Sequence, residues 1–170
     1  MKAPSILSSL PLLSLLSLLA GCQRPEPAPS VEAAASTRRA RIFMISVKDG
    51  AVAGPGAGCD GKIAPVEVEL PAPSPALRGS LEALLAAGDQ YQNAGLYNAL
   101  ANSPLRLERV ERKGATARIY LDGYLELAGE CDGASALSQL TETATQFRDL
   151  TEAELFLDGK PLRELLNGKG

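Results

Sequence analysis

The chain has 170 residues, of which 45% are hydrophobic and 22% are charged, and its formal net charge is −3. These values are typical of a globular protein with room for one domain. The mild acidity argues against a nucleic-acid partner, and the absence of histidine removes the commonest general base and metal ligand, so we expect neither a metal nor a cofactor.

Residues 1–21 have the composition of a secretory signal peptide. Lys2 precedes a Leu- and Ser-rich apolar run from Ile6 to Leu19, which is shorter than the about 20 residues of a spanning helix. The order Leu19-Ala20-Gly21-Cys22 resembles the lipobox of bacterial lipoproteins. This resemblance implies cleavage before Cys22 and acylation of its sulfur, which would anchor the chain on the periplasmic side of the outer membrane or at the cell surface.

Residues 22–38 are predicted to be a tether that follows the lipidated cysteine. They are rich in Pro, Ala and Glu, and Pro25, Pro27 and Pro29 at alternate positions favour an extended, polyproline-like chain. The tether would hold residues 39–170 away from the membrane as a single domain.

The first half of this domain predicts two strands, a helix and a third strand. Residues 42–45 are apolar at every position, which is typical of a strand buried on both faces. Residues 66–70 alternate Val or Leu with Glu and predict a strand with one wet face. Residues 74–88 begin with Ser-Pro, carry leucines at helical spacing and end with Gly, as a helix does. A polar loop at 89–103 leads to a strand at 105–110.

The second half predicts a strand, a helix and a closing strand. Residues 115–121 alternate apolar and polar side chains, residues 134–148 carry an apolar helical stripe, and residues 153–157 alternate again. The run Asp158-Gly159-Lys160-Pro161 turns the chain out of the last strand. The order β-β-α-β-β-α-β indicates an α+β domain with one mixed sheet of about five strands and both helices on one face.

Several of these segments together resemble the GerMN domain, a family named for the sporulation protein GerM. The resemblance covers about residues 39–165 and implies an envelope-associated binding or assembly module, because the family has no established enzymatic activity. Gly123 departs from the family pattern, which often has Ser at this point. The segments that carry the resemblance are Val66-Glu67-Val68, Ser74-Pro75-Ala76-Leu77, Leu81-Glu82-Ala83-Leu84-Leu85, Gly95-Leu96-Tyr97-Asn98-Ala99-Leu100, Ala117-Arg118-Ile119-Tyr120-Leu121, the helix from Leu140 to Phe147, and Phe156-Leu157-Asp158-Gly159-Lys160-Pro161.

Cys59 and Cys131 are the two thiols that remain after lipidation of Cys22. Both lie in predicted loops of an exported domain, where disulfides persist, and each begins a Cys-Asp-Gly turn. We predict that they are bonded to each other in a structural role. A redox pair would need a lowered thiol pKa, and two cysteines without histidine fall short of a zinc site. Asp132 is well placed to cap the second predicted helix.

A partner-binding surface is predicted in the tyrosine-containing loops. Tyr91, Tyr97, Asn98 and Tyr124, together with Tyr120 and the amide side chains of Gln90, Gln92 and Asn93, suit a neutral glycan such as peptidoglycan, although packing explains the same residue types. We therefore expect a non-catalytic lipoprotein that binds an envelope protein or peptidoglycan. The alternative is an enzyme or inhibitor that acts on cell-wall polymers, with a carboxylate pair as its acid and base. The candidates for that pair are Asp122 and Glu126.

Overall fold

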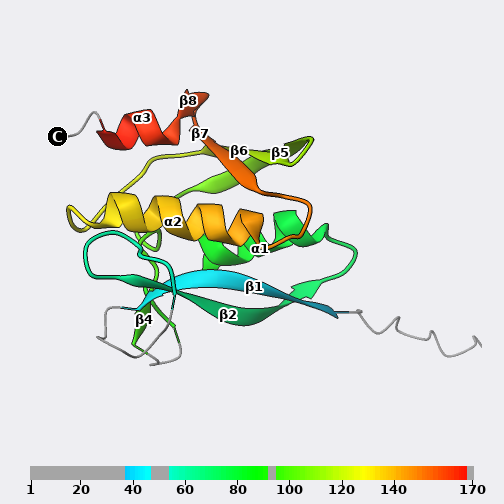
Figure 1. Ribbon diagram of the computed structural model, residues 1–170, viewed down its shortest axis with the longest axis horizontal. Helices are drawn as coiled ribbons and strands as arrows, with labels where there is room; N and C mark the ends of the chain where they lie inside the picture. The colour runs from blue at the N-terminus through cyan, green and yellow to red at the C-terminus, as the bar shows by residue number, and fades with distance from the viewer. Residues whose placement is uncertain (1–36, 47–53, 92–94, 168–170) are drawn as a thin grey trace, which may run out of the picture. The chain divides into compact units, whose positions relative to one another are not determined.

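The computed structural model describes residues 37–46, 54–91 and 95–167 (Figure 1). These described residues belong to one compact unit. The predicted signal peptide, Cys22 and most of the predicted tether lie outside the described residues. The first strand begins at Thr37, so residues 37 and 38 belong to a strand and not to the tether. Within the described ranges, no helix has the length and apolar character that a membrane span requires.

The described elements include three helices and eight strands, and three of the strands, β3, β4 and β8, have two residues each. The long elements follow the predicted order β-β-α-β-β-α-β, which confirms the α+β class. In chain order the elements are β1 (Thr37–Ser46), β2 (Lys62–Pro71), α1 (Ala76–Ala86), β3 (Gln90–Tyr91), β4 (Leu96–Tyr97), β5 (Arg106–Lys113), β6 (Thr116–Asp122), α2 (Asp132–Thr145), β7 (Glu152–Leu157), β8 (Lys160–Pro161) and α3 (Leu162–Asn167).

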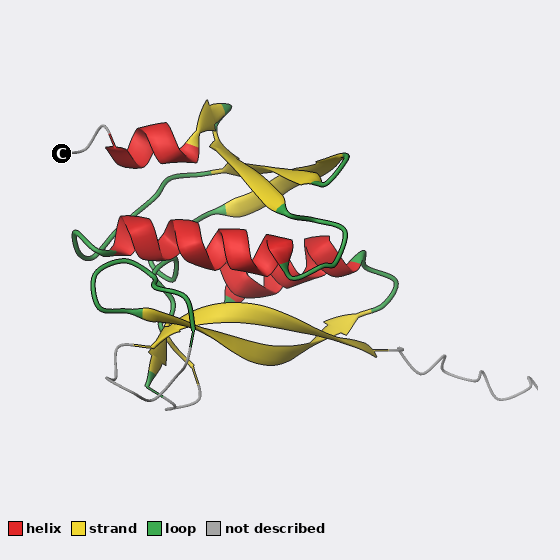
Figure 2. Cartoon of the chain, in the orientation of Figure 1, coloured by secondary structure: helices red, strands yellow, loops and turns green. Residues whose placement is uncertain are grey.

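Two sheets replace the single mixed sheet that the sequence predicts. The first has the strand order β2-β1-β4-β3 and is antiparallel, whereas the second has the order β5-β6-β7-β8 and pairs β6 with β7 in parallel. Helices α1 and α2 lie between the two sheets (Figures 1 and 2), and not on one face of one sheet. A single apolar core therefore includes residues from both sheets and both helices.

Helix α2 can lie between the sheets because it is buried on two faces. One face carries Leu140 into the apolar core, as the sequence predicts. The other carries Ser135, Gln139 and Thr143 at intervals of four residues, and all three are buried. Gln139 Nε2 donates to the carbonyl oxygen of Phe43 at 2.9 Å, and Thr143 Oγ1 accepts the Phe43 N–H at 3.2 Å. Helical periodicity assigns such polar residues to solvent, so the sequence indicates one-sided packing.

Strands β6 and β7 have the alternation that the sequence predicts. β6 buries Ala117, Ile119 and Leu121, and β7 buries Leu155 and Leu157. The residues between them face away from the core on the outer side of the second sheet. The pattern thus correctly predicts these five buried side chains. It is wrong for Ala115, which is exposed in the turn before β6, and Ala153 is half-buried.

Strand β1 is apolar on both faces, as predicted. Ile42 and Met44 belong to the main core. Ile45 lies on the opposite face in a small second cluster with Ala57 and Ile63. The loop that leads into β2 therefore covers part of the outer side of the first sheet.

The end of α1 is capped by Asn98 and not by Gly88. Asn98 Nδ2 donates to the carbonyl oxygens of Leu84 at 3.1 Å and Ala87 at 2.9 Å, and Asn98 Oδ1 accepts the N–H of Leu100 at 3.0 Å. Gly88 does not adopt the left-handed conformation of a capping glycine. Because Asn98 is 2% exposed, it cannot contribute its side chain to the predicted partner-binding surface.

Candidate binding surface

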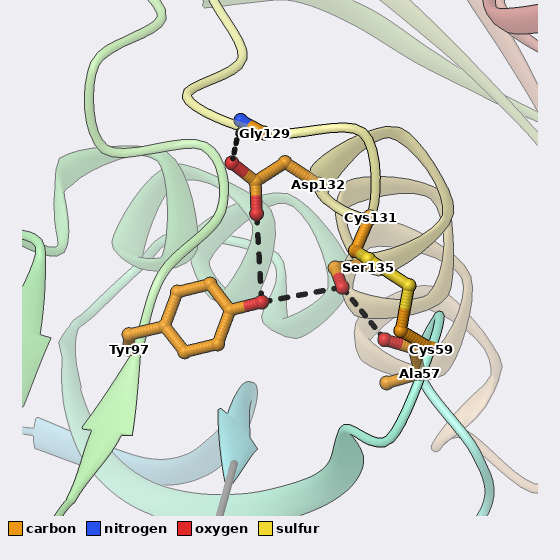
Figure 3. Close-up of a disulfide and its surroundings, with 7 residues drawn as sticks. All are labelled: Ala57, Cys59, Tyr97, Gly129, Cys131, Asp132 and Ser135. Atoms are coloured by element: carbon orange, nitrogen blue, oxygen red, sulfur yellow. Dashed lines mark hydrogen bonds between the residues drawn. A yellow bond between two sulfur atoms is a disulfide. The ribbon is translucent and has the colours of Figure 1, made fainter.

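A disulfide joins the loop before β2 to the start of α2 (Figure 3). Cys59 and Cys131 are the bonded pair that the sequence predicts, with Cα atoms 5.8 Å apart and a separation of 72 positions in the sequence. Next to the bond, Ser135 Oγ donates to the carbonyl oxygen of Ala57 at 2.6 Å. Covalent and hydrogen bonds therefore hold the same loop against α2.

Tyr97 points toward the start of α2 (Figure 3). Its hydroxyl oxygen lies 3.4 Å from Ser135 Oγ and 3.5 Å from Asp132 Oδ1. Asp132 Oδ2 accepts the N–H groups of Ala128 at 3.0 Å and Gly129 at 2.9 Å, so this carboxylate closes the turn before the helix and does not cap it as predicted. These contacts give Tyr97 and Asp132 a structural role at this end of the domain.

The predicted partner-binding residues do not form one exposed surface. Tyr97 and Asn98 make internal contacts. The side chain of Tyr91 lies outside the described part of the chain. Tyr124 follows β6 and is 61% exposed. Of the four, Tyr124 is the side chain that the structure shows open to solvent.

The outer face of the second sheet carries an aromatic pair that the sequence does not predict, although Tyr120 is one of the predicted glycan-stacking tyrosines. Tyr120 on β6 and Phe156 on β7 are in register, and their rings stack with centroids 4.9 Å apart and an interplanar angle of 13°. Arg109 on β5 lies opposite Tyr120, and its guanidinium carbon is 3.6 Å from the centre of that ring. Alternation shows that Tyr120 and Phe156 point outward, but their contact depends on a parallel register that the sequence does not reveal.

Charged side chains surround the aromatic pair. Glu111 accepts hydrogen bonds from Arg109 Nε at 2.9 Å and from the Tyr120 hydroxyl at 3.3 Å. Arg118 Nε lies 2.7 Å from Glu154 Oε2, an ion pair that lacks hydrogen-bond geometry. We call these residues the outer-face cluster, which consists of Arg109, Glu111, Arg118, Tyr120, Glu154 and Phe156.

The contacts of Glu111 in the outer-face cluster should make the stability of the fold depend on pH. The hydrogen bond from Arg109 lowers the pKa of the Glu111 carboxyl below its usual value, and Glu111 raises the pKa of Arg109 in return. A lowered carboxyl pKa stabilises the fold above the usual glutamate pKa, and this stabilisation is lost as the pH falls through the lowered value. Glu111→Gln should therefore lower the thermal midpoint at neutral pH and leave it unchanged at about pH 2.

Thermal unfolding followed by circular dichroism at both pH values checks this expectation. Glu67→Gln, which removes an exposed carboxylate from the other sheet, is the matched control. An equal loss in Glu111→Gln at both pH values would show that the carboxylate charge does not stabilise the cluster.

A hollow of about 400 Å³ opens beside β7 and continues from the outer-face cluster, because Phe156 belongs to both. Leu137 of α2 lines it, together with most of β7, Pro161 of β8 and the first turn of α3. A second hollow of about 250 Å³ is lined by Tyr124 and by Lys160 of β8. Strand β8 thus contributes to two hollows, and the exposed Tyr124 lies at the second.

The carboxylates of the alternative enzyme hypothesis do not line these hollows. Asp122 accepts a hydrogen bond from Arg106 Nε at 3.2 Å and is held in that ion pair. Glu126 is exposed, and its backbone N–H donates to Ser103 Oγ at 2.9 Å. Neither residue lines either of the two hollows. In the described ranges, His, Cys, Asp and Glu side chains do not gather in threes as a metal site would require.

Comparison with known protein families identifies the domain. The family called Germane, described as "Sporulation and spore germination", matches residues 56–163, which is more than half of the chain. The chain belongs to the Germane family. The matched range of the Germane domain begins just before Cys59 and ends in α3, so it contains the disulfide and the outer-face cluster.

Solved structures show the same fold as this Germane domain. The tandem GerMN domains of the sporulation protein GerM from Bacillus subtilis align with a TM-score of 0.56 and 12% identity, over 81% of this chain and 44% of that one. This chain therefore spans less than half of the tandem structure. The first GerMN domain of the same protein aligns with a TM-score of 0.50 and 16% identity, over 74% of this chain and 86% of that one. A sequence comparison with curated proteins gave no match.

Proposed function

We propose that this chain is a non-catalytic lipoprotein of the bacterial cell envelope whose Germane domain binds another envelope protein. The observation that carries the proposal is the outer-face cluster with its adjoining hollow. A stacked aromatic pair among charged side chains combines apolar contact area with polar groups, which is the composition that protein-binding surfaces favour. A structural role in the core does not explain this cluster, because it lies on the outer side of the second sheet.

The proposed membrane anchor determines where this recognition takes place. Acylation of Cys22 would confine the domain to a thin layer beside one membrane, and the Pro-rich residues 23–36 would set its distance from the lipid. Confinement raises the effective concentration of the domain for partners in the same layer. A surface of moderate affinity is therefore sufficient for stable recognition.

The experiment is site-specific photo-crosslinking in the native envelope. A photoreactive phenylalanine analogue replaces Phe156 in the outer-face cluster, and in a matched control it replaces the exposed Glu67 of β2 on the other sheet. We expect a discrete crosslinked protein from position 156 and at least about a tenfold weaker product from position 67.

Two results would contradict the proposal. Equal products from both positions would mean that the outer face has no special role, and no product from position 156 would mean that it binds nothing there. A product that moves as a discrete band only after cell-wall digestion would assign the surface to glycan and not to protein. Mass spectrometry of the crosslinked band distinguishes these outcomes.

A further inference from the structure

Most strand edges of the two sheets are protected against pairing with another chain. The edge of β1 is covered by Gln139 and Thr143 of α2 and by β4. β2 contains Pro65 and ends at Pro71, and proline cannot donate to a neighbouring strand. β5 is charged at six of its eight positions and has a bulge near Leu107. Bulges, charges and prolines are the usual devices that prevent strand addition.

Strand β7 lacks this protection along the first part of its outer edge. Its even-numbered residues bond to the β6 side, since the N–H groups of Glu152 and Asp158 reach carbonyl oxygens there. Alternation therefore directs the N–H and C=O groups of Ala153 to the opposite side. Among the described residues, β8 pairs on that side with Phe156 and Leu157 alone, so residues 152–155 have no strand neighbour there. The larger hollow lies directly against this edge.

We propose that the free edge of β7 binds an extended basic segment of the partner protein by strand addition. This inference rests on the proposed function and names the chemistry of its partner. An added strand would pair with the main-chain groups of Ala153 and present its side chains alternately to two sides of the sheet. One side meets the hollow, and the other meets the outer-face cluster.

The residues that line the hollow beside this edge determine which side chains of the added strand fit. Leu137, Leu155 and Pro161 give the hollow apolar walls, which suit aliphatic side chains on one side of the segment. The charged lining residues are three glutamates and one arginine, and the arginine is Arg163. One of the glutamates, Glu154, is already paired with Arg118, whereas Glu152 accepts a hydrogen bond from the Thr116 hydroxyl and belongs to none of the ion pairs among the described residues. The excess of acid favours lysine or arginine in the segment.

The probe is a library of random peptides of about twelve residues, displayed for selection on the purified full-length chain in detergent micelles. Enriched peptides should alternate basic and aliphatic residues. One selected peptide is then methylated on its backbone nitrogens, either at the odd-numbered or at the even-numbered positions. One of these two sets should weaken binding by about tenfold or more, because its N–H groups pair with β7, and the other set should leave binding nearly unchanged. Exchange of the Ala153 amide hydrogen with solvent should slow when the peptide binds.

Charge variants test the selectivity without changing the core. Glu152→Gln combined with Glu164→Gln should weaken the basic peptide severalfold, and Glu67→Gln on the other sheet should not. The proposal is overturned if no peptide is enriched, if neither N-methylation parity matters, or if the Ala153 amide is unaffected. A discrete crosslink from position 156 together with any of these results would leave the proposed function standing and reject strand addition alone.

Discussion

A Gly123→Ser variant is expected to lose at least about 3 kcal/mol of unfolding free energy. Gly123 has a φ of 117°, a conformation that residues with a side chain rarely adopt, and it passes directly beside the backbone of Pro104. A Cβ atom at this position would overlap the carbonyl oxygen of Pro104, which cannot move without disturbing the start of β5. Serine, the residue that the family pattern often has at this point, would therefore destabilise this chain.

Variants of two other glycines distinguish the cost of the left-handed backbone conformation from the cost of the overlap with Pro104. Gly114 has a φ of 60° and open space where a Cβ atom would lie, so Gly114→Ser should cost about 1 to 2 kcal/mol from the left-handed conformation alone. Gly88 is neither left-handed nor crowded, and Gly88→Ser should change stability by less than about 0.5 kcal/mol. Urea unfolding of the three variants measures the series. Equal losses at positions 114 and 123 would show that the chain relaxes around Pro104 at no cost.

Removal of the disulfide is expected to cost about 4 kcal/mol of unfolding free energy. Cys59 and Cys131 are separated by 72 positions, and in the chain-entropy model a cross-link over a loop of that size removes about this much free energy from the unfolded state. Such a loss is a large part of the net stability of a small domain, which is about 5 to 15 kcal/mol. The double variant Cys59→Ser/Cys131→Ser should unfold at a much lower urea concentration than the natural chain.

A reducing agent supplies the control for the disulfide experiment. Reduction should destabilise the natural chain to the level of the double variant and should have no effect on the variant itself. The hydrogen bond between Ser135 and Ala57 and the contacts of Tyr97 do not depend on the covalent bond, so the loop should keep part of its packing. A loss below about 1 kcal/mol would mean that these contacts, and not the disulfide, hold the loop against α2.

The sequence predicts the elements of this domain better than their assembly. The alternation in β6 correctly predicts its buried residues, and the two cysteines that remain in an exported domain correctly predict the disulfide, because both depend on local pattern and on residue chemistry. The predicted turn at Cys131-Asp132-Gly133 is wrong, because Asp132 and Gly133 belong to α2. The prediction of a single sheet is wrong because α2 has a second buried face, and the residues on that face are polar. Gln139 is fully buried and bonds to the main chain of Phe43 and Ala99, a contact that no helical periodicity indicates.

The candidate site was less accessible to sequence reasoning. Tyr97 and Asn98 have the residue types of a binding loop, but both are used for packing and capping. Tyr120 and Phe156 come from strands separated by α2, and they meet only because β6 and β7 pair in parallel with the two residues in register. The open edge at Ala153 likewise depends on where β8 stops pairing, which is a property of the fold and not of any motif.

We have proposed that the Germane domain, anchored to a membrane through Cys22, recognises a protein through the outer face of its second sheet. Crosslinking from position 156, carried out in parallel in the natural chain and in a Cys22→Ser variant at equal expression, tests it most directly. We expect one discrete crosslinked protein from the natural chain, held at the membrane by the proposed anchor, and at least about a tenfold lower yield from the unanchored variant. An equal yield from both chains, or no product from the anchored chain, would contradict it.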